Sequence, residues 1–188
     1  MHIPKFYTVL SIAALSLVKL AGAHDTSLAS VKYAFQGAHI PEDLRLIFEP
    51  KIHLKVTYFL DDRSTFDVYP GAPLARHDTA YPPMYNVSGC HVGAGPFVVT
   101  MIDPGPQLNP NITQVRHFLG GDYYYNELNG VFYNRTPAVT EYKQPSPPRN
   151  SDPHRLYFDI AKFAYETELG DPIAGNFVLV GPEVQAAV

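Results

Sequence analysis

Three side chains in this sequence could together hold a small oxyanion. Asp103 ends an apolar run, His117 lies within a second apolar run, and His154 follows the Pro147-Pro148 pair. Two imidazoles and nearby loop amides supply convergent donors for a phosphate, while a carboxylate can fix an imidazole tautomer or accept from an ammonium group. Prolines beside such a site stiffen the loop, so that less conformational entropy is lost on binding.

Each of these residues also has a purely structural explanation. An aspartate directly before a proline, as in Asp103-Pro104, is a common start of a turn. His117 on a strand could be a half-buried ring with its polar atoms satisfied, and His154 could form a surface pair with Arg155. The chemistry of the individual residues therefore leaves both alternatives open.

Strands are needed to bring these segments together. Apolar and β-branched runs predict strands at Leu54–Leu60, Phe97–Ile102, Val115–Leu119 and Asn176–Val180. We expect Phe97–Ile102 to be a central strand of its sheet, and Gly120-Gly121 to end the strand that carries His117.

Helices and loops fill the remaining chain. Pro41–Leu44 predicts a short helical turn, and Asp159–Gly170 predicts a helix with Asp159 as its N-cap and Gly170 at its end. Asp61–Tyr81 is rich in Asp, Arg, Pro and Gly and predicts a loop or a ragged hairpin. Pro145–Pro153 holds four prolines in nine positions, which predicts a stiff, extended loop.

The composition is that of a globular protein that does not bind nucleic acid. The chain has 188 residues, of which 46% are hydrophobic and 17% charged, and its formal net charge is −4. This length favours one domain, here residues 24–188, and there is no basic run to displace counterions from a nucleic-acid backbone. The 18 prolines and 13 glycines favour short strands and turns over long helices.

The first 23 residues have the pattern of a secretory signal peptide. Lys5 precedes an apolar stretch, Tyr7–Val18, that is too short to span a bilayer, and Ala21-Gly22-Ala23 offers a cleavage site. A membrane anchor is the alternative, but Lys19 interrupts the apolar run. We therefore expect a secreted, extracellular protein without a transmembrane span.

Secretion makes three Asn-x-Ser/Thr sequences candidate glycosylation sites. They begin at Asn86, Asn111 and Asn134, each beside turn-forming residues. Cys90 is the single cysteine, so no disulfide can form within the chain, and a small buried hydrophobe is its simplest interpretation.

The order of the motifs resembles the phosphatidylethanolamine-binding protein family. The segments that carry the resemblance lie in the same order along nearly all of residues 31–180: His39–Leu44, Asp103–Pro106, Arg116–Phe118, Tyr142–Arg155 and Leu169–Phe177. The resemblance implies a mostly β fold of two antiparallel sheets with short helices. It also implies an anion pocket, for phosphate or a phospholipid headgroup, formed by Asp103, His117, His154 and the Pro147-Pro148 loop.

The chain departs from this family after Arg155. The family has a long apolar strand there, whereas here Arg155 runs almost directly into the predicted helix. Either this core strand is absent or Leu156–Phe158 is a stub of it. We therefore expect a shortened version of the family's chain, natural or from an error in the gene model, and a non-functional truncated variant is one of the less favoured alternatives. A missing strand would leave an unpaired sheet edge and a gap in the core.

These observations predict a non-enzymatic binding protein for a small anion. The alternative is an inhibitor of a secretory-pathway or extracellular serine carboxypeptidase, since the family includes carboxypeptidase and kinase inhibitors. An enzyme is disfavoured because the chain lacks the nucleophile elbow, the zinc-protease helix, the phosphate-binding loop and the dinucleotide-binding glycine pattern. No cofactor or metal is predicted.

Overall fold

The computed structural model describes residues 27–89, 93, 95–104, 114–145 and 153–181. Its helices are α1 (Leu28–Gly37), α2 (Ile40–Leu44), the 3-10 helix η1 (His77–Thr79), α3 (Pro153–Leu156) and α4 (Ile160–Glu166). Its strands are β1 (His53–Phe59), β2 (Thr65–Asp67), β3 (Ala72–Ala75), β4 (Met84–Ser88), β5 (Phe97–Asp103), β6 (Val115–Tyr125), β7 (Phe132–Asn134) and β8 (Val178–Gly181). The predicted signal peptide lies outside the described residues.

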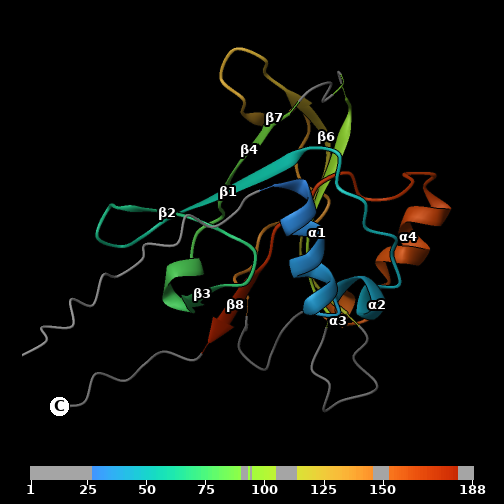
Figure 1. Ribbon diagram of the computed structural model, residues 1–188, viewed down its shortest axis with the longest axis horizontal. Helices are drawn as coiled ribbons and strands as arrows, with labels where there is room; N and C mark the ends of the chain where they lie inside the picture. Colours follow the sequence, from blue (N-terminus) through green and yellow to red (C-terminus); the bar gives the residue numbers. More distant parts are fainter. Residues whose placement is uncertain (1–26, 90–92, 94, 105–113, 146–152, 182–188) are drawn as a thin grey trace, which may run out of the picture.

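The strands form two antiparallel sheets and one parallel pair. The antiparallel sheets have the orders β2-β1-β4 and β5-β6-β7, and β3 pairs with β8 in parallel. Figure 1 shows the α-helices grouped at one side of these sheets, with β2, β3 and β8 toward the other. The mostly β fold with two antiparallel sheets is therefore confirmed, while the parallel pair was not predicted.

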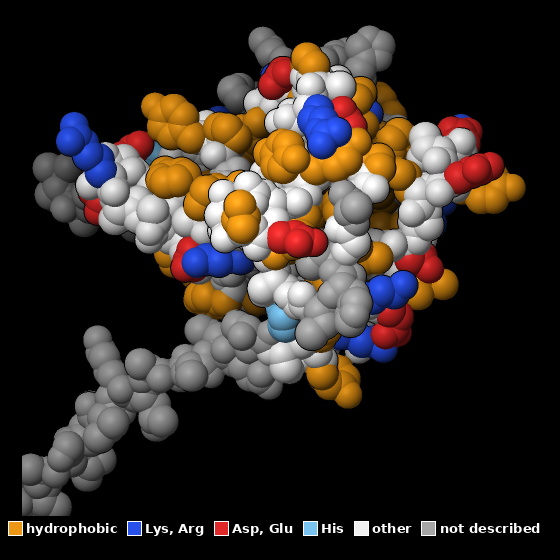
Figure 2. All heavy atoms as spheres, turned by 90° about the horizontal axis from the view of Figure 1, so that it is seen from above, with side chains coloured by type: hydrophobic (Ala, Val, Ile, Leu, Met, Phe, Trp, Pro, Cys, Tyr) orange, Lys and Arg blue, Asp and Glu red, His pale blue; other side chains and the backbone are white. Residues whose placement is uncertain are grey.

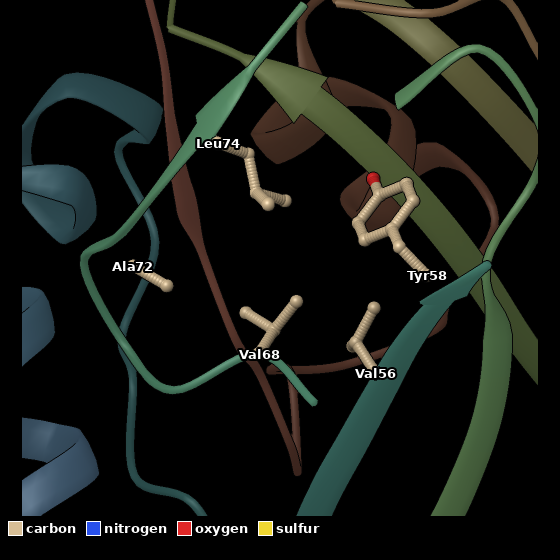
Figure 3. Close-up of a cluster of buried hydrophobic side chains, with 5 residues drawn as sticks. All are labelled: Val56, Tyr58, Val68, Ala72 and Leu74. Atoms are coloured by element: carbon tan, nitrogen blue, oxygen red, sulfur yellow. The ribbon is translucent and has the colours of Figure 1, made fainter. Parts of the chain in front are cut away.

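The main core cluster lies between β1 and the segment that leads into β3. Val56 and Tyr58 of β1 pack with Val68, Ala72 and Leu74, and Figure 3 shows these side chains turned toward one shared space. Val56 and Tyr58 are two positions apart, so they lie on the same face of β1. The strand predicted at Leu54–Leu60 is thus confirmed, although Thr57, between these two residues, is buried as well.

A second core cluster fixes the N-terminal helix to the C-terminal segment. Phe35 of α1 stacks on Phe48 with the ring centroids 4.2 Å apart, and the edge of the Phe177 ring meets it at 5.0 Å. Phe35 and Phe48 are each at most 8% exposed. Burial of one such ring stabilises the fold by about 1.5–3 kcal/mol. The cluster therefore fixes α1 to the C-terminal segment, although Phe35 and Phe177 lie far apart in the sequence.

Helix α4 begins where the sequence predicted. Asp159 is its N-cap, and the Asp159 carboxylate accepts a hydrogen bond from the backbone N–H of Lys162 at 3.0 Å. This bond lowers the pKa of Asp159, with a smaller contribution from the neighbouring Arg45 guanidinium. The helix ends at Glu166, four residues before Gly170, which has a positive φ of 71°.

Strand β6 is longer than predicted. It runs from Val115 to Tyr125, through Gly120-Gly121, rather than ending at Leu119. The reason is steric: a Cβ on Gly120 would lie 2.7 Å from the ring of Tyr123 and 2.9 Å from that of Phe118. Gly120 thus makes room for two aromatic rings inside the strand, and its interpretation as a strand terminator was wrong.

Among the strands that the structure describes, β5 is an edge strand and not a central one. Among the described strands it pairs only with β6. Most of its residues are half-buried, but this burial does not come from strand neighbours on both edges. The prediction of a central strand was therefore wrong, because side-chain burial and backbone pairing are separate properties.

The segments predicted as loops contain regular structure. Asp61–Tyr81 holds β2, β3 and η1, and only its β1–β2 turn fits a ragged hairpin. Pro153, predicted as the end of an extended loop, instead begins α3. The last described strand begins at Val178 rather than Asn176, and the Asn176 side-chain amide donates to the carbonyl of Val68 at 2.9 Å.

The segment after Arg155 forms no strand. Leu156 ends α3, Tyr157 makes one isolated parallel bridge to Gln114, and Phe158 is buried. The stub considered from the sequence is thus a single bridge. Helix α4 begins three positions after that bridge, at Ile160.

Candidate functional site

His117 lies at an irregularity in β6 that aims its side chain. Phe118 pairs with Met101 and Arg116 pairs with Ile102, so the register of the β5–β6 ladder skips His117. An extra residue on one strand is a β-bulge, which bends the strand and redirects a side chain. The His117 side chain is 2% exposed and contributes to the lining of a cavity of about 920 Å³.

A backbone carbonyl fixes the tautomer of the His117 ring. His117 Nδ1 lies 3.0 Å from the carbonyl oxygen of Lys143. A carbonyl can only accept, so Nδ1 carries the proton and donates this hydrogen bond. In the neutral ring Nε2 is then an acceptor, and it becomes a donor only when the ring is protonated. Within the described residues, buried Nε2 has no hydrogen-bond partner.

Asp103 lies beside this nitrogen, at the end of β5. One oxygen of its carboxylate, Oδ2, is 4.0 Å from His117 Nε2. This distance is too long for a hydrogen bond but short enough for the two charges to interact when the ring is protonated. The Asp103 side chain is 47% exposed, so the carboxylate meets solvent while the imidazole is enclosed. The tautomer of His117 is fixed by Lys143 and not by Asp103.

The backbone around His117 is held by two further donors. The N–H of Lys143 donates to the His117 carbonyl at 2.9 Å, and Nη1 of Arg155 donates to the same oxygen at 3.1 Å. Arg155 is only 7% exposed, so it is not the surface residue considered from the sequence. Its cation anchors the bulge from α3, which fixes the position of the imidazole.

Tyrosines form a neutral wall near the site. Tyr58 and Tyr85 line the cavity, and the Tyr142 hydroxyl donates to the carbonyl of Thr79 at 2.6 Å. Burial raises the pKa of all three phenols above the usual value. These hydroxyls therefore remain uncharged at physiological pH, and they add no negative charge to that of Asp103.

Other predicted site residues fall partly outside the described residues. Pro147 and Pro148 lie outside them, as does Asn111. The backbone of His154 belongs to α3, directly before Arg155, but the position of its side chain is not described. Of the predicted pocket residues, the structure thus brings Asp103 and His117 together.

Sequence reasoning missed the role of two residues at this site. Lys143 acts through its backbone, for which no side-chain pattern gives a signal. Arg155 was visible beside His154, but nothing in the local sequence marks it as buried. Among the described residues, no group of three or more His, Cys, Asp or Glu side chains could hold a metal ion. In the same residues, no helix is long and apolar enough to cross a membrane.

Comparison with known proteins supports the fold. The chain superposes with a TM-score of 0.67 on a crystal structure of carboxypeptidase Y inhibitor complexed with its cognate proteinase. The match has 17% sequence identity and covers 85% of this chain and 98% of the inhibitor chain. No protein-family model matches the sequence, and no curated protein matches it.

These observations assign the chain to a fold class. This chain has a mostly β fold like that of carboxypeptidase Y inhibitor, a protein with the phosphatidylethanolamine-binding protein fold. At 17% identity the similarity shows the fold alone. The solved structure is described as an inhibitor, which is compatible with the prediction of a non-enzymatic protein.

Proposed function

We propose that this protein is a non-enzymatic binding protein for a small anion, either a phosphate or a phospholipid headgroup. The observation that carries the proposal is the enclosed Nε2 of His117, a residue that lines a cavity; this nitrogen has no hydrogen-bond partner in the described part of the chain. A buried polar atom without a partner is uncommon in folded proteins and marks a place where a ligand atom can bind.

Protonation of His117 determines which ligand atom this nitrogen can bind. With Nδ1 committed to the Lys143 carbonyl, the protonated ring presents one N–H from Nε2 toward the cavity. That N–H can donate to a phosphate oxygen, whereas the neutral ring cannot. Asp103, 4.0 Å away, opposes a simple anion but can accept from an ammonium group of the same ligand. The pair is therefore best matched by a zwitterion such as phosphoethanolamine.

Calorimetric titration with inorganic phosphate and with phosphoethanolamine tests this proposal. We expect His117→Gln to weaken both ligands at least ~10-fold, which corresponds to about 1.4 kcal/mol. His77→Gln, at an exposed histidine, is the matched control and should leave both affinities unchanged. Equal affinities in wild type and His117→Gln would exclude the proposed site.

Substitution of Asp103 should change the affinities for phosphate and for phosphoethanolamine differently. Asp103→Asn removes the negative charge, so phosphate should bind more tightly and phosphoethanolamine should lose its preference over phosphate. Asp61→Asn, an exposed change distant in sequence, serves as the control.

Inhibition of a serine carboxypeptidase is a second candidate function. It is favoured by the fold similarity to carboxypeptidase Y inhibitor, a protein whose structure was solved with its proteinase bound. The test is the rate of peptide hydrolysis by a purified serine carboxypeptidase at increasing concentrations of this protein. Undiminished hydrolysis with the folded protein in ~100-fold excess over enzyme would reject this function.

Secretion and glycosylation are part of the first proposal. Asn134 is exposed at the end of β7, whereas Asn86 is half-buried within β4 and its side-chain oxygen is enclosed. We therefore expect a glycan on Asn134 and none on Asn86. Expression in a eukaryotic secretory host should give a product that begins near His24, and Asn134→Gln should remove a mass that glycosidase also removes. A glycan lost only with Asn86→Gln would contradict this choice.

A further inference from the structure

The large cavity is bordered by strand edges rather than by strand faces. It is lined by consecutive residues of three strands: Val99–Asp103 of β5, Pro73–Ala75 of β3, and Val178–Gly181 of β8. Successive side chains of a strand point to opposite faces. A cavity over one face of a strand would be lined by alternate residues only, whereas a consecutive run fits a cavity along the strand's edge.

Strand β1 provides the contrast within the same cavity. It contributes Leu54, Val56 and Tyr58, which are spaced by two and share one face. Figure 3 shows Val56 and Tyr58 pointing into the space that Val68 and Leu74 border from the other side. The cavity therefore has the face of β1 as one wall and the edges of β5, β3 and β8 as others.

The strands along these edges have few backbone partners. Within the described residues β5 pairs only with β6, and β3 and β8 pair only with each other. A parallel pair is rarely found outside a larger sheet, and an unpaired strand edge exposes a row of N–H and C=O groups. The cavity thus has an apolar interior and is bordered by strand edges with which no other described strand pairs.

We propose that this cavity binds an extended, apolar peptide segment of a partner protein, which adds a strand along the outer edge of β5. A bound strand supplies backbone donors and acceptors for the edge and apolar side chains for the interior, whereas an acyl chain supplies only the second. The Val99–Asp103 run accommodates about five residues, or ~17 Å of extended chain. The proposal goes beyond anion binding and does not depend on it.

Charge specifies one more feature of the partner. Asp103 is the one carboxylate among the described lining residues, and no Lys or Arg is among them. Its partly exposed side chain lies at the end of the β5 edge. The peptide should therefore be apolar over most of its length and carry a Lys or Arg at the end that lies next to Asp103.

Two synthetic peptides test this proposal. They are acetyl-Trp-Val-Thr-Ile-Val-Lys-amide and acetyl-Lys-Val-Ile-Thr-Val-Trp-amide, which place the cation at either end. The protein has no tryptophan, so the peptide's fluorescence reports binding directly. Analogues with N-methyl groups on the central residues keep every side chain and the charge but cannot donate backbone hydrogen bonds. We expect at least one parent peptide to bind, and its N-methylated analogue to bind at least ~10-fold more weakly.

Protein variants locate the binding to the β5 edge. Thr100 lines the cavity and is exposed, so Thr100→Lys should fold and should abolish binding by placing a charge in the apolar space. Val98→Lys, on the same strand but outside the lining, is the matched control and should bind normally. Asp103→Asn should weaken binding about 3-fold or more at low salt.

Three results would overturn the proposal. The first is no binding of either peptide at concentrations up to ~1 mM, a limit chosen as the weakest affinity of interest. The second is equal binding of the parent and N-methylated peptides, which would mean that the cavity binds any apolar chain. In that case laurate, titrated in parallel, should bind as well. The third is Thr100→Lys protein that is folded by circular dichroism and still binds. If Thr100→Lys does not fold, the comparison between the parent and the N-methylated peptides tests the proposal by itself.

Discussion

Strands β5 and β6 are neighbours in one sheet, yet the chain secures them very differently. On the side away from β5, Leu119 of β6 exchanges two backbone hydrogen bonds with Thr140, and the His117 carbonyl accepts from Lys143 and Arg155. In the described part of the chain, no strand pairs with the outer edge of β5, which borders the cavity. Strand β6 therefore has hydrogen-bond partners on both edges, whereas β5 has a described strand partner on one edge only.

This difference gives the two strands separate roles: β6 positions the imidazole of His117, and β5 offers its open edge to a ligand. The secured strand carries the bulge and the imidazole, whose orientation is set by hydrogen bonds within the protein. The open edge carries Asp103 and the apolar residues that a ligand could meet. Figure 2 shows hydrophobic side chains spread over one face of the molecule among scattered charges, without a continuous charged surface. Binding specificity is therefore expected to come from the cavity and its rim rather than from a surface field.

Amide hydrogen exchange should show the largest contrast between the two strands. The N–H of Leu119 bonds to the Thr140 carbonyl at 3.1 Å and should exchange only through extensive opening. The alternate β5 amides that do not bond to β6 should exchange at least ~100-fold faster. Exchange measured residue by residue by NMR checks this expectation. Uniform protection along β5 would mean that a further segment pairs with its outer edge.

The sequence predicted those parts of the fold that have a local signal. The strand predicted at Leu54–Leu60 and the aspartate cap of α4 depend on residues a few positions apart, and both were confirmed. The β3–β8 pair was missed because Ala72–Ala75 contains Pro73, and its partner is about a hundred residues away. No local pattern can indicate such a pairing.

The features of the candidate site also differ in whether the sequence gives a signal for them. Asp103 and His117 were selected by residue type and by the resemblance to a family, and their proximity depends on the β5–β6 register. The tautomer of His117 depends on the carbonyl of Lys143, a group that every residue carries. A backbone contact of this kind cannot be read from side-chain identity, so geometry was needed to decide when Nε2 donates and when it accepts.

Removal of Gln114 should test how firmly β6 is secured at its first end. Gln114 is 1% exposed, and its side-chain oxygen accepts from the N–H of Ile160 at 2.9 Å, at the start of α4. Gln114→Ala leaves that buried N–H without a partner and opens a cavity, so we expect a loss of about 2–4 kcal/mol in the free energy of unfolding. Urea denaturation measures this loss.

An exposed glutamine provides the control for that experiment. Gln36→Ala in α1 should change the free energy of unfolding by less than ~0.5 kcal/mol. If Gln114→Ala were equally mild, the contact between β6 and α4 would contribute little, and the comparison between a secured β6 and an open β5 would lose one of its supports.

The smallest effect is expected at Tyr142, next to the residue that orients His117. Tyr142→Phe removes the hydrogen bond to the Thr79 carbonyl and should cost about 0.5–1.5 kcal/mol in the free energy of unfolding. Burial raises the pKa of this phenol, so its contribution is fully present below the ordinary tyrosine pKa of about 10 and is lost as the pH rises above it.

Alkaline unfolding therefore distinguishes Tyr142 from an exposed tyrosine. Above a pH of about 10 the unfolded chain releases the phenolic proton while the folded chain retains it, so the unfolded state is favoured. Tyr142→Phe should reduce the decrease in stability with pH, whereas Tyr165→Phe, at a side chain that is 86% exposed, should not. Because Lys143 follows Tyr142 directly, the same variant should weaken anion binding at His117 only slightly if the backbone of Lys143 keeps its place. A large loss of binding would show that the Tyr142 hydroxyl, through Thr79, holds the segment that fixes the imidazole.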